Sequence, residues 1–265
     1  IVGDAMARPL ASELDSDPGR YDTSSLIVIS SAGAVFSEAV KAELKKHLPN
    51  VFFIDAFGST ESGHTGSMTA TRSASASGHP RFQMTDNVTV LDDARKPVRP
   101  GSGVIGLLAR KGRLPVGYYK DAKKTAETFI ELDGDRWVVP GDMATIDADG
   151  MITVFGRGAV CINSGGEKIF PEEVEEVLKA HPEVEDAIVV GIPDDRWGQR
   201  VAAVVQPRAS CSPAASSVDA HCRKHIAGYK VPKDFHFVSK VQRQPSGKPD
   251  YKWARELAVA ATAAR

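Results

Sequence analysis

The stretch "LIVISSAGAVFSEAVKAELKKHLPNVFFID", residues 26–55, decides the fold class of the first part of the chain. It begins and ends with a short continuous apolar run, and between the runs three apolar residues recur at helical spacing: Val40, Leu44 and Leu48. A helix between two such runs predicts parallel strands that are buried on both faces. Ligands of such sheets collect beyond the carboxyl ends of the strands, which here are residues 30–35 and 55–63.

The segments before and after this unit differ from it in composition and in the structure that they predict. The start, "IVGDAMARPL", is typical of the interior of a longer chain that is leaving a strand, so we expect a fragment. Residues 65–81 are rich in Ser, Thr, Gly and Ala and predict a loop. From 82 to 155 short β-type runs alternate with turn signals, which predicts a small antiparallel β-barrel or sheet. One helical patch, residues 121–130, interrupts these runs.

After Arg157 the pattern becomes helix, strand, strand, helix, strand. Pro171 suits the first position of a helix, and the glutamates that follow it favour the positive end of the helix dipole. The apolar runs at 186–193 and 201–207 predict two strands. The fold class is therefore α/β followed by α+β: a βαβ unit over 1–81, a barrel-like part over 82–156, a hinge at 157–160 and a small domain at 161–265.

Composition excludes several function classes. Apolar residues make up 42% and charged residues 25%, as in a folded globular protein. Because 33 basic residues face 34 acidic ones, no overall field favours nucleic acid or an anionic membrane. No apolar run reaches the roughly 18–20 residues of a membrane span. Three cysteines without CxxC spacing disfavour a disulfide framework, so we expect a cytoplasmic protein.

The segment "DAFGSTESG" (55–63) carries the first candidate site. Phe57 offers a flat ring for stacking, Gly58 allows close backbone approach, and Thr60 and Glu61 offer a hydroxyl and a hard oxygen ligand. Such a set suits a nucleotide with magnesium. An ordinary polar turn explains the same residues equally well.

The second candidate is a basic segment near the end of the chain. Two acidic residues, Asp234 and Asp250, lie between 223 and 255 with nine basic ones: Arg223, Lys224, Lys230, Lys233, Lys240, Arg243, Lys248, Lys252 and Arg255. A local basic face on a neutral protein favours a small polyanionic ligand, although a solvated surface is the plainer interpretation. Within it, "QPSGKPD" presents Lys248 on a Pro/Gly loop.

Taken in order, these stretches resemble the acyl-adenylate-forming enzymes, the superfamily of acyl-CoA synthetases, peptide-synthetase adenylation domains and luciferases. Six motifs occur in the family's order and at its approximate spacing: "SAGAV", "FGSTE", "GDMATIDADGMITVFGR", "SGGEKIFPEEVE", "YKVP" and "PSGK". The segments "GEKIFPEEVE" and "GKPDYKWA" are most similar to those of bacterial fatty-acid or related carboxylate CoA ligases. The resemblance implies the end of the large N-terminal domain, followed by a small mobile C-terminal domain.

The resemblance also implies roles for single residues in the binding of ATP or AMP. Gly33 and Ala34 correspond to the lining of the adenine site. Asp55 matches the position that accepts a hydrogen bond from the adenine amine, and Phe57 stands where the family usually has a stacking Tyr. Gly58 belongs to the same motif.

Further roles concern the phosphates, the ribose and catalysis. Thr60 corresponds to the residue that holds a phosphate oxygen and Glu61 to the ligand of Mg²⁺. Asp142 matches the carboxylate that takes both ribose hydroxyls, and Arg157 matches the residue that reaches ribose or phosphate. Lys248 matches the lysine that supports adenylation.

In this family the small domain rotates between the two half-reactions. It presents first the "PSGK" loop and then the glycine loop, here Gly165 and Gly166, to the pantetheine thiol of coenzyme A. Glycines suit that role because they lack Cβ and let backbone lie close to a narrow tunnel. The family usually has Asp or Lys at the hinge, whereas this chain has Gly158, Ala159 and Val160. The residue about which the small domain pivots is therefore not assigned.

The expected activity is ATP-dependent, AMP-forming ligation of a carboxylic acid of the fatty type to coenzyme A. The alternatives are a carrier-protein-loading adenylating enzyme and a non-catalytic nucleotide-binding or interaction fragment. The family's phosphate loop and most of its acyl pocket are expected to precede residue 1, in a missing N-terminal half. The chain alone is therefore expected to be weak or inactive in adenylation.

Overall fold

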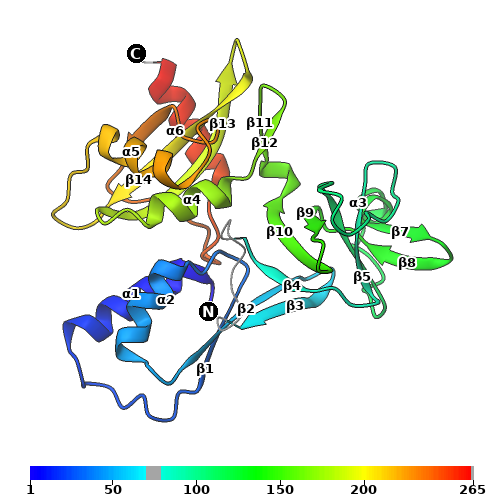
Figure 1. The fold of residues 1–265 in the computed structure, drawn as a ribbon, viewed down its shortest axis with the longest axis horizontal. Helices are drawn as coiled ribbons and strands as arrows, with labels where there is room; N and C mark the ends of the chain where they lie inside the picture. The colour runs from blue at the N-terminus through cyan, green and yellow to red at the C-terminus, as the bar shows by residue number, and fades with distance from the viewer. Residues whose placement is uncertain (70–78, 264–265) are drawn as a thin grey trace. The chain divides into compact units, whose positions relative to one another are not determined.

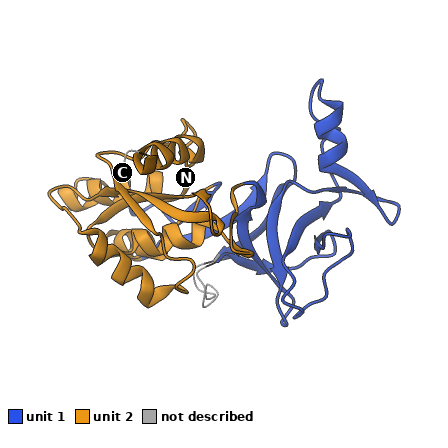
Figure 2. Ribbon diagram, turned by 90° about the horizontal axis from the view of Figure 1, so that it is seen from above, with its two compact units in different colours: residues 1, 23–33, 50–159 blue, residues 2–22, 34–49, 160–265 orange. Residues whose placement is uncertain are grey.

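The computed structural model describes residues 1–69 and 79–263. Two compact units are distinguished (Figure 2). Unit 1 comprises residues 1, 23–33 and 50–159, and unit 2 comprises residues 2–22, 34–49 and 160–265. The predicted division into a large part, a hinge at 157–160 and a small part stays a prediction, because one spatial grouping does not define where a chain pivots.

The first sheet of unit 1 contains the predicted pair of parallel strands. β1 (Val28–Ala32) and β2 (Phe52–Ser59) run parallel, with Ser31 opposite Asp55. In the sequence α2 (Glu38–His47) lies between them, and the Ser37 side chain caps this helix by accepting from the Val40 N–H. The predicted order of strand, helix and strand is therefore confirmed (Figure 1).

Burial on both faces of these strands is the part of the prediction that is wrong. Ile29 and Phe53 are buried, whereas Val28 is 42% and Phe52 53% exposed. Successive side chains of a strand point to opposite faces, so one face of this sheet is packed and the other carries exposed apolar residues. Among the described residues, β1 lies at an edge of the sheet, whose order is β1-β2-β3.

Part of the segment expected to be a loop is a strand. β3 (Gly63–Thr69) pairs antiparallel with β2. Residues 70–78 of the same expected loop lie outside the described residues. β3 could not be predicted from the sequence because its Gly, Ser and Thr residues show no apolar alternation. Its backbone nevertheless forms hydrogen bonds with β2.

The second sheet of unit 1 is antiparallel and has seven strands. The strands are β4 (Arg81–Gln83), β5 (Val88–Leu91), β6 (Gly106–Lys111), β7 (Phe129–Leu132), β8 (Asp135–Val138), β9 (Asp142–Ile146) and β10 (Met151–Arg157). Their order is β4-β10-β9-β6-β8-β7, with β5 also paired to β6, so the described strands form an open sheet. Of the two predicted forms, a barrel or a sheet, the described strands therefore form the sheet, because no bonds join β4 to β7 within the described residues. The predicted helical patch is α3 (Ala122–Thr128).

Unit 2 is built around a long antiparallel pair, β13 (Val184–Asp194) and β14 (Gly198–Pro207). The short strands β11 (Ile162–Ser164) and β12 (Glu167–Ile169) continue the sheet, and β15 (Asp234–Phe237) runs parallel to β14. Helices α4 (Pro171–Lys179), α5 (Ala215–His225) and α6 (Tyr251–Ala263) complete this α+β part.

Both faces of the central pair are covered. Ala187 and Val189 of β13 belong to a core cluster with residues of α4 and α5, and Ile188 and Val190 belong to another cluster with residues of α6. The period of two along a strand sends neighbouring residues to opposite faces, which explains the continuous apolar runs. α6 was not part of the sequence prediction.

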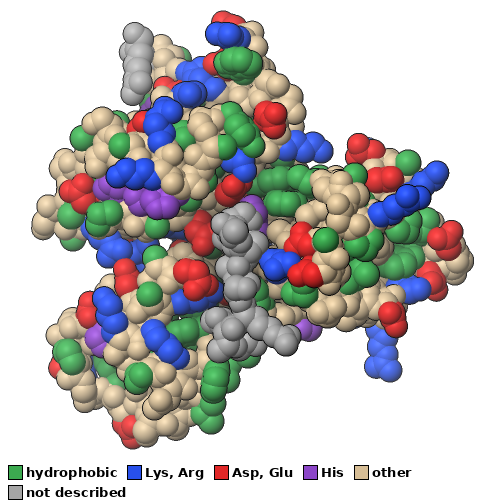
Figure 3. All heavy atoms as spheres, viewed as in Figure 1, with side chains coloured by type: hydrophobic (Ala, Val, Ile, Leu, Met, Phe, Trp, Pro, Cys, Tyr) green, Lys and Arg blue, Asp and Glu red, His purple; other side chains and the backbone are tan. Residues whose placement is uncertain are grey.

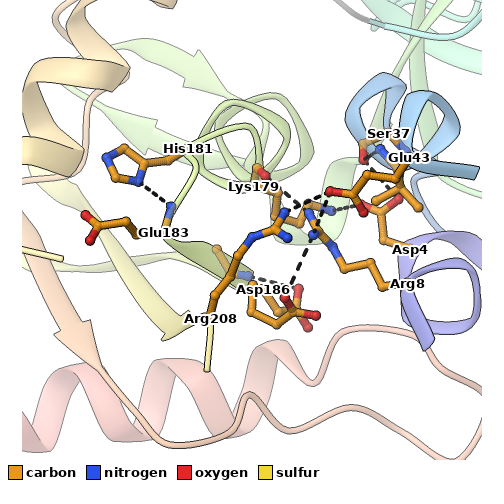
Figure 4. A network of polar contacts seen from close by, with 12 residues as sticks. Asp4, Arg8, Ser37, Glu43, Lys179, His181, Glu183, Asp186 and Arg208 are labelled. Carbon is orange, nitrogen blue, oxygen red and sulfur yellow. Dashed lines mark hydrogen bonds and ion pairs between the residues drawn. The ribbon is translucent and has the colours of Figure 1, made fainter. Parts of the chain in front are cut away.

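The helices α1 (Gly3–Ser16) and α2 are joined to α4 within unit 2 by a buried ionic cluster (Figure 4). Asp4 Oδ2 lies 3.0 Å from Lys179 Nζ, and the two side chains are 4% and 3% exposed. Asp4 Oδ1 also accepts from the backbone N–H and the hydroxyl of Ser37, at 2.8 and 3.0 Å. Arg8 Nη2 donates to the Lys179 carbonyl oxygen at 3.2 Å.

Charge pairing in this cluster outweighs the effect of burial. Burial alone would raise the pKa of Asp4, but the charge of Lys179 and the bonds from Ser37 lower it below the ordinary value. Burial would likewise lower the pKa of Lys179, yet Asp4 and Glu175 raise it. Both groups are therefore ionised at neutral pH. Among the described residues, no helix is long and apolar enough to cross a membrane.

Candidate nucleotide site

The turn that follows β2 is held rigidly by hydroxyl groups. The N–H of Ser59 donates to Ser62 Oγ and the N–H of Ser62 donates to Ser59 Oγ, both at 3.0 Å. Thr65 Oγ1 donates to Ser62 Oγ, and Arg110 Nη1 donates to the Ser62 carbonyl oxygen at 2.6 Å. Thr60 is exposed and Glu61 partly exposed on this turn, so the bonds fix the backbone from which both side chains project.

Glu61 receives a short hydrogen bond from a distant part of unit 1. The Tyr118 hydroxyl donates to Glu61 Oε1 at 2.6 Å. That bond is the largest influence on the carboxyl group and, with smaller contributions from Ser59 and the charge of Arg157, holds the pKa of Glu61 below its ordinary value against the effect of partial burial. Burial first, and then the bond to Glu61, raise the pKa of Tyr118. Glu61 is therefore a carboxylate at neutral pH.

Asp142 and Arg157 face each other across neighbouring strands. Asp142 begins β9, Arg157 ends β10, and the two are opposite in the register of the strands. Arg157 Nε lies 3.1 Å from Asp142 Oδ1, with the Asp142 side chain 9% and the Arg157 side chain 48% exposed. Arg157 Nη1 also donates to the Pro140 carbonyl oxygen at 2.8 Å. The charge of Arg157 also acts on Glu61, where it helps to lower the pKa of the carboxyl group.

Two residues of the β2 motif serve the fold in ways that the sequence did not indicate. Phe57 lies within β2 rather than in a loop, and its ring stacks on that of Phe82 with centroids 5.6 Å apart. At Gly58 a Cβ atom would lie 2.2 Å from the Gly63 carbonyl oxygen, so the close approach is made by β3. Their predicted contacts with a nucleotide stay a prediction.

The adenine residues predicted from the sequence lie just beyond the end of β1 and within β2. Gly33 follows β1 with φ at +81°, a conformation that favours glycine. Asp55 is partly buried in β2. Ala34, the next residue after Gly33, is grouped with unit 2.

The glycine pair forms a tight turn instead of a flexible loop. Ser164 pairs with Glu167 across β11 and β12, so Gly165 and Gly166 are the two central residues of a hairpin. Their φ angles are +60° and +92°, as a type I′ turn requires at both central positions. At Gly165 a Cβ atom would lie 2.6 Å from Trp197 Cε3, whereas nothing lies within 4 Å of one at Gly166.

The helix after this hairpin begins as the sequence predicts. Phe170 is the N-cap, Pro171 takes the first position of α4, and Glu172 and Glu173 lie in its first turn. Val174 and Leu178 of the helix are fully buried in the core. The hairpin therefore stands on a firmly anchored helix.

Lys248 lies in unit 2 on a hydrogen-bonded turn. The Gln244 N–H donates to the Lys248 carbonyl oxygen at 2.9 Å, and the Gly247 N–H donates to the Gln244 carbonyl oxygen at 2.8 Å. Arg243 Nη1 donates to the Gly247 carbonyl oxygen at 3.1 Å. The Lys248 side chain is exposed.

The basic segment around Lys248 is partly neutralised by carboxylates. Ion pairs join Arg223 to Asp219, Lys230 to Glu173 and Arg243 to Asp186, at 2.6, 2.7 and 2.6 Å. On the face drawn in Figure 3, basic and acidic side chains are likewise interspersed over each unit. These pairs weaken the expectation of a uniform basic face for a polyanion.

The predicted site residues thus divide between the units. Unit 1 holds most of them: Gly33, Asp55, Phe57, Gly58, Thr60, Glu61, Asp142 and Arg157. Unit 2 holds the others: Ala34, Gly165, Gly166 and Lys248. The contacts in unit 1 join Glu61 to Tyr118, which sequence reasoning missed, and Asp142 to Arg157, whose charge also acts on Glu61. No local signal could have found Tyr118, because 57 residues separate it from Glu61.

The donor set limits which metal this site could hold. The described residues contain no cluster of three or more His, Cys, Asp or Glu able to hold an ion. Mg²⁺ is usually bound by one or two carboxylates together with substrate phosphates and water. An ionised Glu61 with one oxygen fixed by Tyr118 fits that mode of binding.

Comparison with known proteins gives first a domain match and then similar longer proteins. Residues 173–248 match the AMP-binding enzyme C-terminal domain. The crystal structure of the anthranilate CoA ligase AuaEII in complex with anthranoyl-AMP has a TM-score of 0.80, over 98% of this chain and 54% of that one. At 24% identity, this likeness shows the fold alone.

Closer relatives are found by sequence. The chain is 51% identical to the medium/long-chain-fatty-acid–CoA/3-oxocholest-4-en-26-oate–CoA ligase of Mycolicibacterium smegmatis, over 97% of the chain and 47% of the relative. It is 46% identical to the 3-oxocholest-4-en-26-oate–CoA ligase of Rhodococcus rhodochrous, with the same two coverages. The resemblance is confirmed: the chain is related to the C-terminal portion of acyl-adenylate-forming CoA ligases. It spans about half the length of these relatives.

Proposed function

We propose that the protein to which this chain belongs ligates a carboxylic acid of the fatty type to coenzyme A, with ATP converted to AMP through an acyl-adenylate. From the structure, the ion pair of Arg157 with Asp142 and the hydrogen-bonded Glu61 carboxylate, which lie in the same unit, support this proposal. The sequence identity of 51% to a ligase of medium- and long-chain fatty acids supports the substrate class. That the named relatives are CoA ligases favours coenzyme A over a carrier protein.

Each candidate residue has a role that its surroundings support. The buried Asp142 carboxylate, oriented by Arg157, would accept hydrogen bonds from the ribose hydroxyls. Gly33 and Ala34 would line the adenine, Asp55 would accept from its amine, and Thr60 would hold a phosphate oxygen. Phe57 and Gly58 would support this wall from β2. Glu61 would hold Mg²⁺, which when bound offsets phosphate charge.

The chemistry requires positioned charge more than proton transfer. In the first half-reaction the substrate carboxylate attacks the α-phosphate and pyrophosphate leaves. A lysine ammonium such as that of Lys248 would stabilise the charge that develops there, and loss of one such donor typically lowers rates about 10²- to 10³-fold. In the second half-reaction the thiol of coenzyme A attacks the acyl-adenylate and releases AMP. Gly165 and Gly166 would border the path of that thiol. Action in the cytoplasm remains our expectation.

Nucleotide binding by the chain itself tests the proposal. We expect AMP to raise the melting temperature of the wild type, because a ligand that binds the folded state alone adds about 2.7 kcal/mol at 100 times its dissociation constant. Asp142→Asn should reduce the shift, since Asn offers one acceptor oxygen in place of two. Asp93→Asn, an exposed carboxylate in unit 1, is the matched control. The absence of any shift with AMP or ATP would refute the proposed nucleotide site.

A further inference from the structure

We propose that Tyr118 is a positioning residue, which holds Glu61 for binding of the cation that accompanies ATP. This inference rests on the proposed function and adds a residue to it. The 2.6 Å bond from the Tyr118 hydroxyl occupies Oε1 of Glu61 and leaves the rotation of the carboxylate restricted. A carboxylate that is oriented in this way loses less conformational entropy when its other oxygen binds a cation.

The backbone around Tyr118 is built to fix its ring. The Tyr118 N–H donates to Thr125 Oγ1 at 2.9 Å, and Thr125 Oγ1 donates to the Asp121 carbonyl oxygen at 2.7 Å. Asp121 also caps α3 by accepting from the Lys124 N–H at 2.9 Å. At Gly117 a Cβ atom would lie 2.4 Å from Thr125 Cγ2, so this approach to the helix requires glycine.

The ring itself is held on two sides. Lys124 Nζ lies 4.1 Å from the ring centroid of Tyr118, a distance at which a cation and an aromatic face attract each other. The ring of Phe129 meets that of Tyr118 edge-on, with centroids 6.2 Å apart. α3 and its flanking residues therefore form a rigid support whose polar tip is the hydroxyl that reaches Glu61.

The other end of the contact is equally constrained. Glu61 projects from the turn that Ser59, Ser62 and Arg110 fix by hydrogen bonds. A short bond between two segments that are each held by hydrogen bonds sets the direction of the carboxylate. Groups that hold a metal ligand by a hydrogen bond typically change metal affinity about 10- to 100-fold.

The test compares a metal-dependent ligand with a metal-independent one on the intact chain. The variant Tyr118→Phe keeps the ring between Lys124 and Phe129 and removes only the hydroxyl. Affinity for Mn²⁺ in the presence of ATP is measured by electron paramagnetic resonance, and affinity for AMP without metal by calorimetry. We expect Tyr118→Phe to weaken Mn²⁺ binding about tenfold and to leave AMP affinity unchanged.

Two further variants separate positioning from general damage. Tyr119→Phe removes the neighbouring hydroxyl from a side chain that is 87% exposed and should change neither affinity. In a Glu61→Gln background, Tyr118→Phe should have no additional effect on Mn²⁺ binding. Unchanged Mn²⁺ affinity in Tyr118→Phe, or an equal loss for Mn²⁺ with ATP and for AMP, would overturn the inference. A wild type that binds neither nucleotide would instead overturn the proposed function.

Discussion

Glu175 provides a quantitative test of how unit 2 is stabilised. It lies on α4, is 2% exposed, and accepts a hydrogen bond from the Val189 N–H at 3.0 Å. Burial raises its pKa from 4.5 to about 7, and Asp186 adds to the rise, while Lys179, the bond from Val189 and Arg243 oppose it. Burial first, and then the charge of this carboxyl group, raise the pKa of the Tyr251 phenol of α6.

The sign of the pH dependence follows from the direction of this shift. The folded state holds the proton of Glu175 more tightly than the unfolded chain, so protonation stabilises the fold. The contribution is fully present below pH 4.5 and is lost as pH rises through about 7. Because one pKa unit corresponds to about 1.4 kcal/mol, the loss between about pH 5 and pH 8 amounts to about 2 to 3 kcal/mol.

The variant Glu175→Gln isolates this effect, because Gln can still accept from the Val189 N–H but carries no charge. Relative to the wild type, its free energy of unfolding should improve by about 2 to 3 kcal/mol between about pH 5 and pH 8. Hydrogen exchange of the β13 amides measures this locally, because β13 belongs to unit 2 and amide exchange reports on the opening of the surrounding structure.

The exposed residue Glu167 supplies the matched control, Glu167→Gln, which should keep the pH dependence of the wild type. Parallel pH profiles for the wild type and Glu175→Gln would refute the reasoning. Such a result would mean that Lys179 and Arg243 compensate the burial of Glu175 completely.

Three further predictions concern other parts of unit 2. Lys179→Met should cost about 3 to 5 kcal/mol in urea unfolding because it leaves Asp4 buried without its cation, and adding Asp4→Asn should recover part of that loss. Gly166→Ala should lower the melting temperature through backbone strain of about 1 to 2 kcal/mol, and Gly165→Ala should lower it further because its Cβ meets Trp197; equal effects would contradict the geometry. In the active protein, Lys248→Ala should slow adenylation about 10²- to 10³-fold and thioester formation less, whereas equal losses in the two half-reactions would argue against its role.

The sequence was informative where side-chain pattern and backbone requirements agree. The central strands of unit 2 were predictable because their middle parts, residues 187–190 and 201–205, are buried and continuously apolar. α4 was predictable because Pro171 and the glutamates mark its first turn. α6 was not, since its buried positions are the small residues Ala254 and Ala258, which give little amphipathic contrast against an alanine-rich background.

The residues of the candidate site were likewise predictable from the sequence only in part. Glu61, Asp142 and Arg157 could be proposed from the sequence because they lie in motifs of recognisable order. Tyr118 was not, because its contact with Glu61 depends on how the chain brings the start of α3 to the end of β2. The hairpin at Gly165 and Gly166 shows a further limit, since adjacent glycines serve a tight turn as readily as a flexible loop.

The first residue of the chain has a consequence for experiments on this protein. The Ile1 amino group donates to the Ser30 carbonyl oxygen at 2.8 Å, and the Ala32 N–H donates to the Ile1 carbonyl oxygen at 3.2 Å. This alternation is that of a parallel ladder, so a tag that continues the chain before Ile1 in the same direction would run along β1, which is an edge strand among the described residues. An affinity tag placed there would compete for the backbone groups of that edge and lie beside the exposed Ile27. A fusion after α6 avoids this interference.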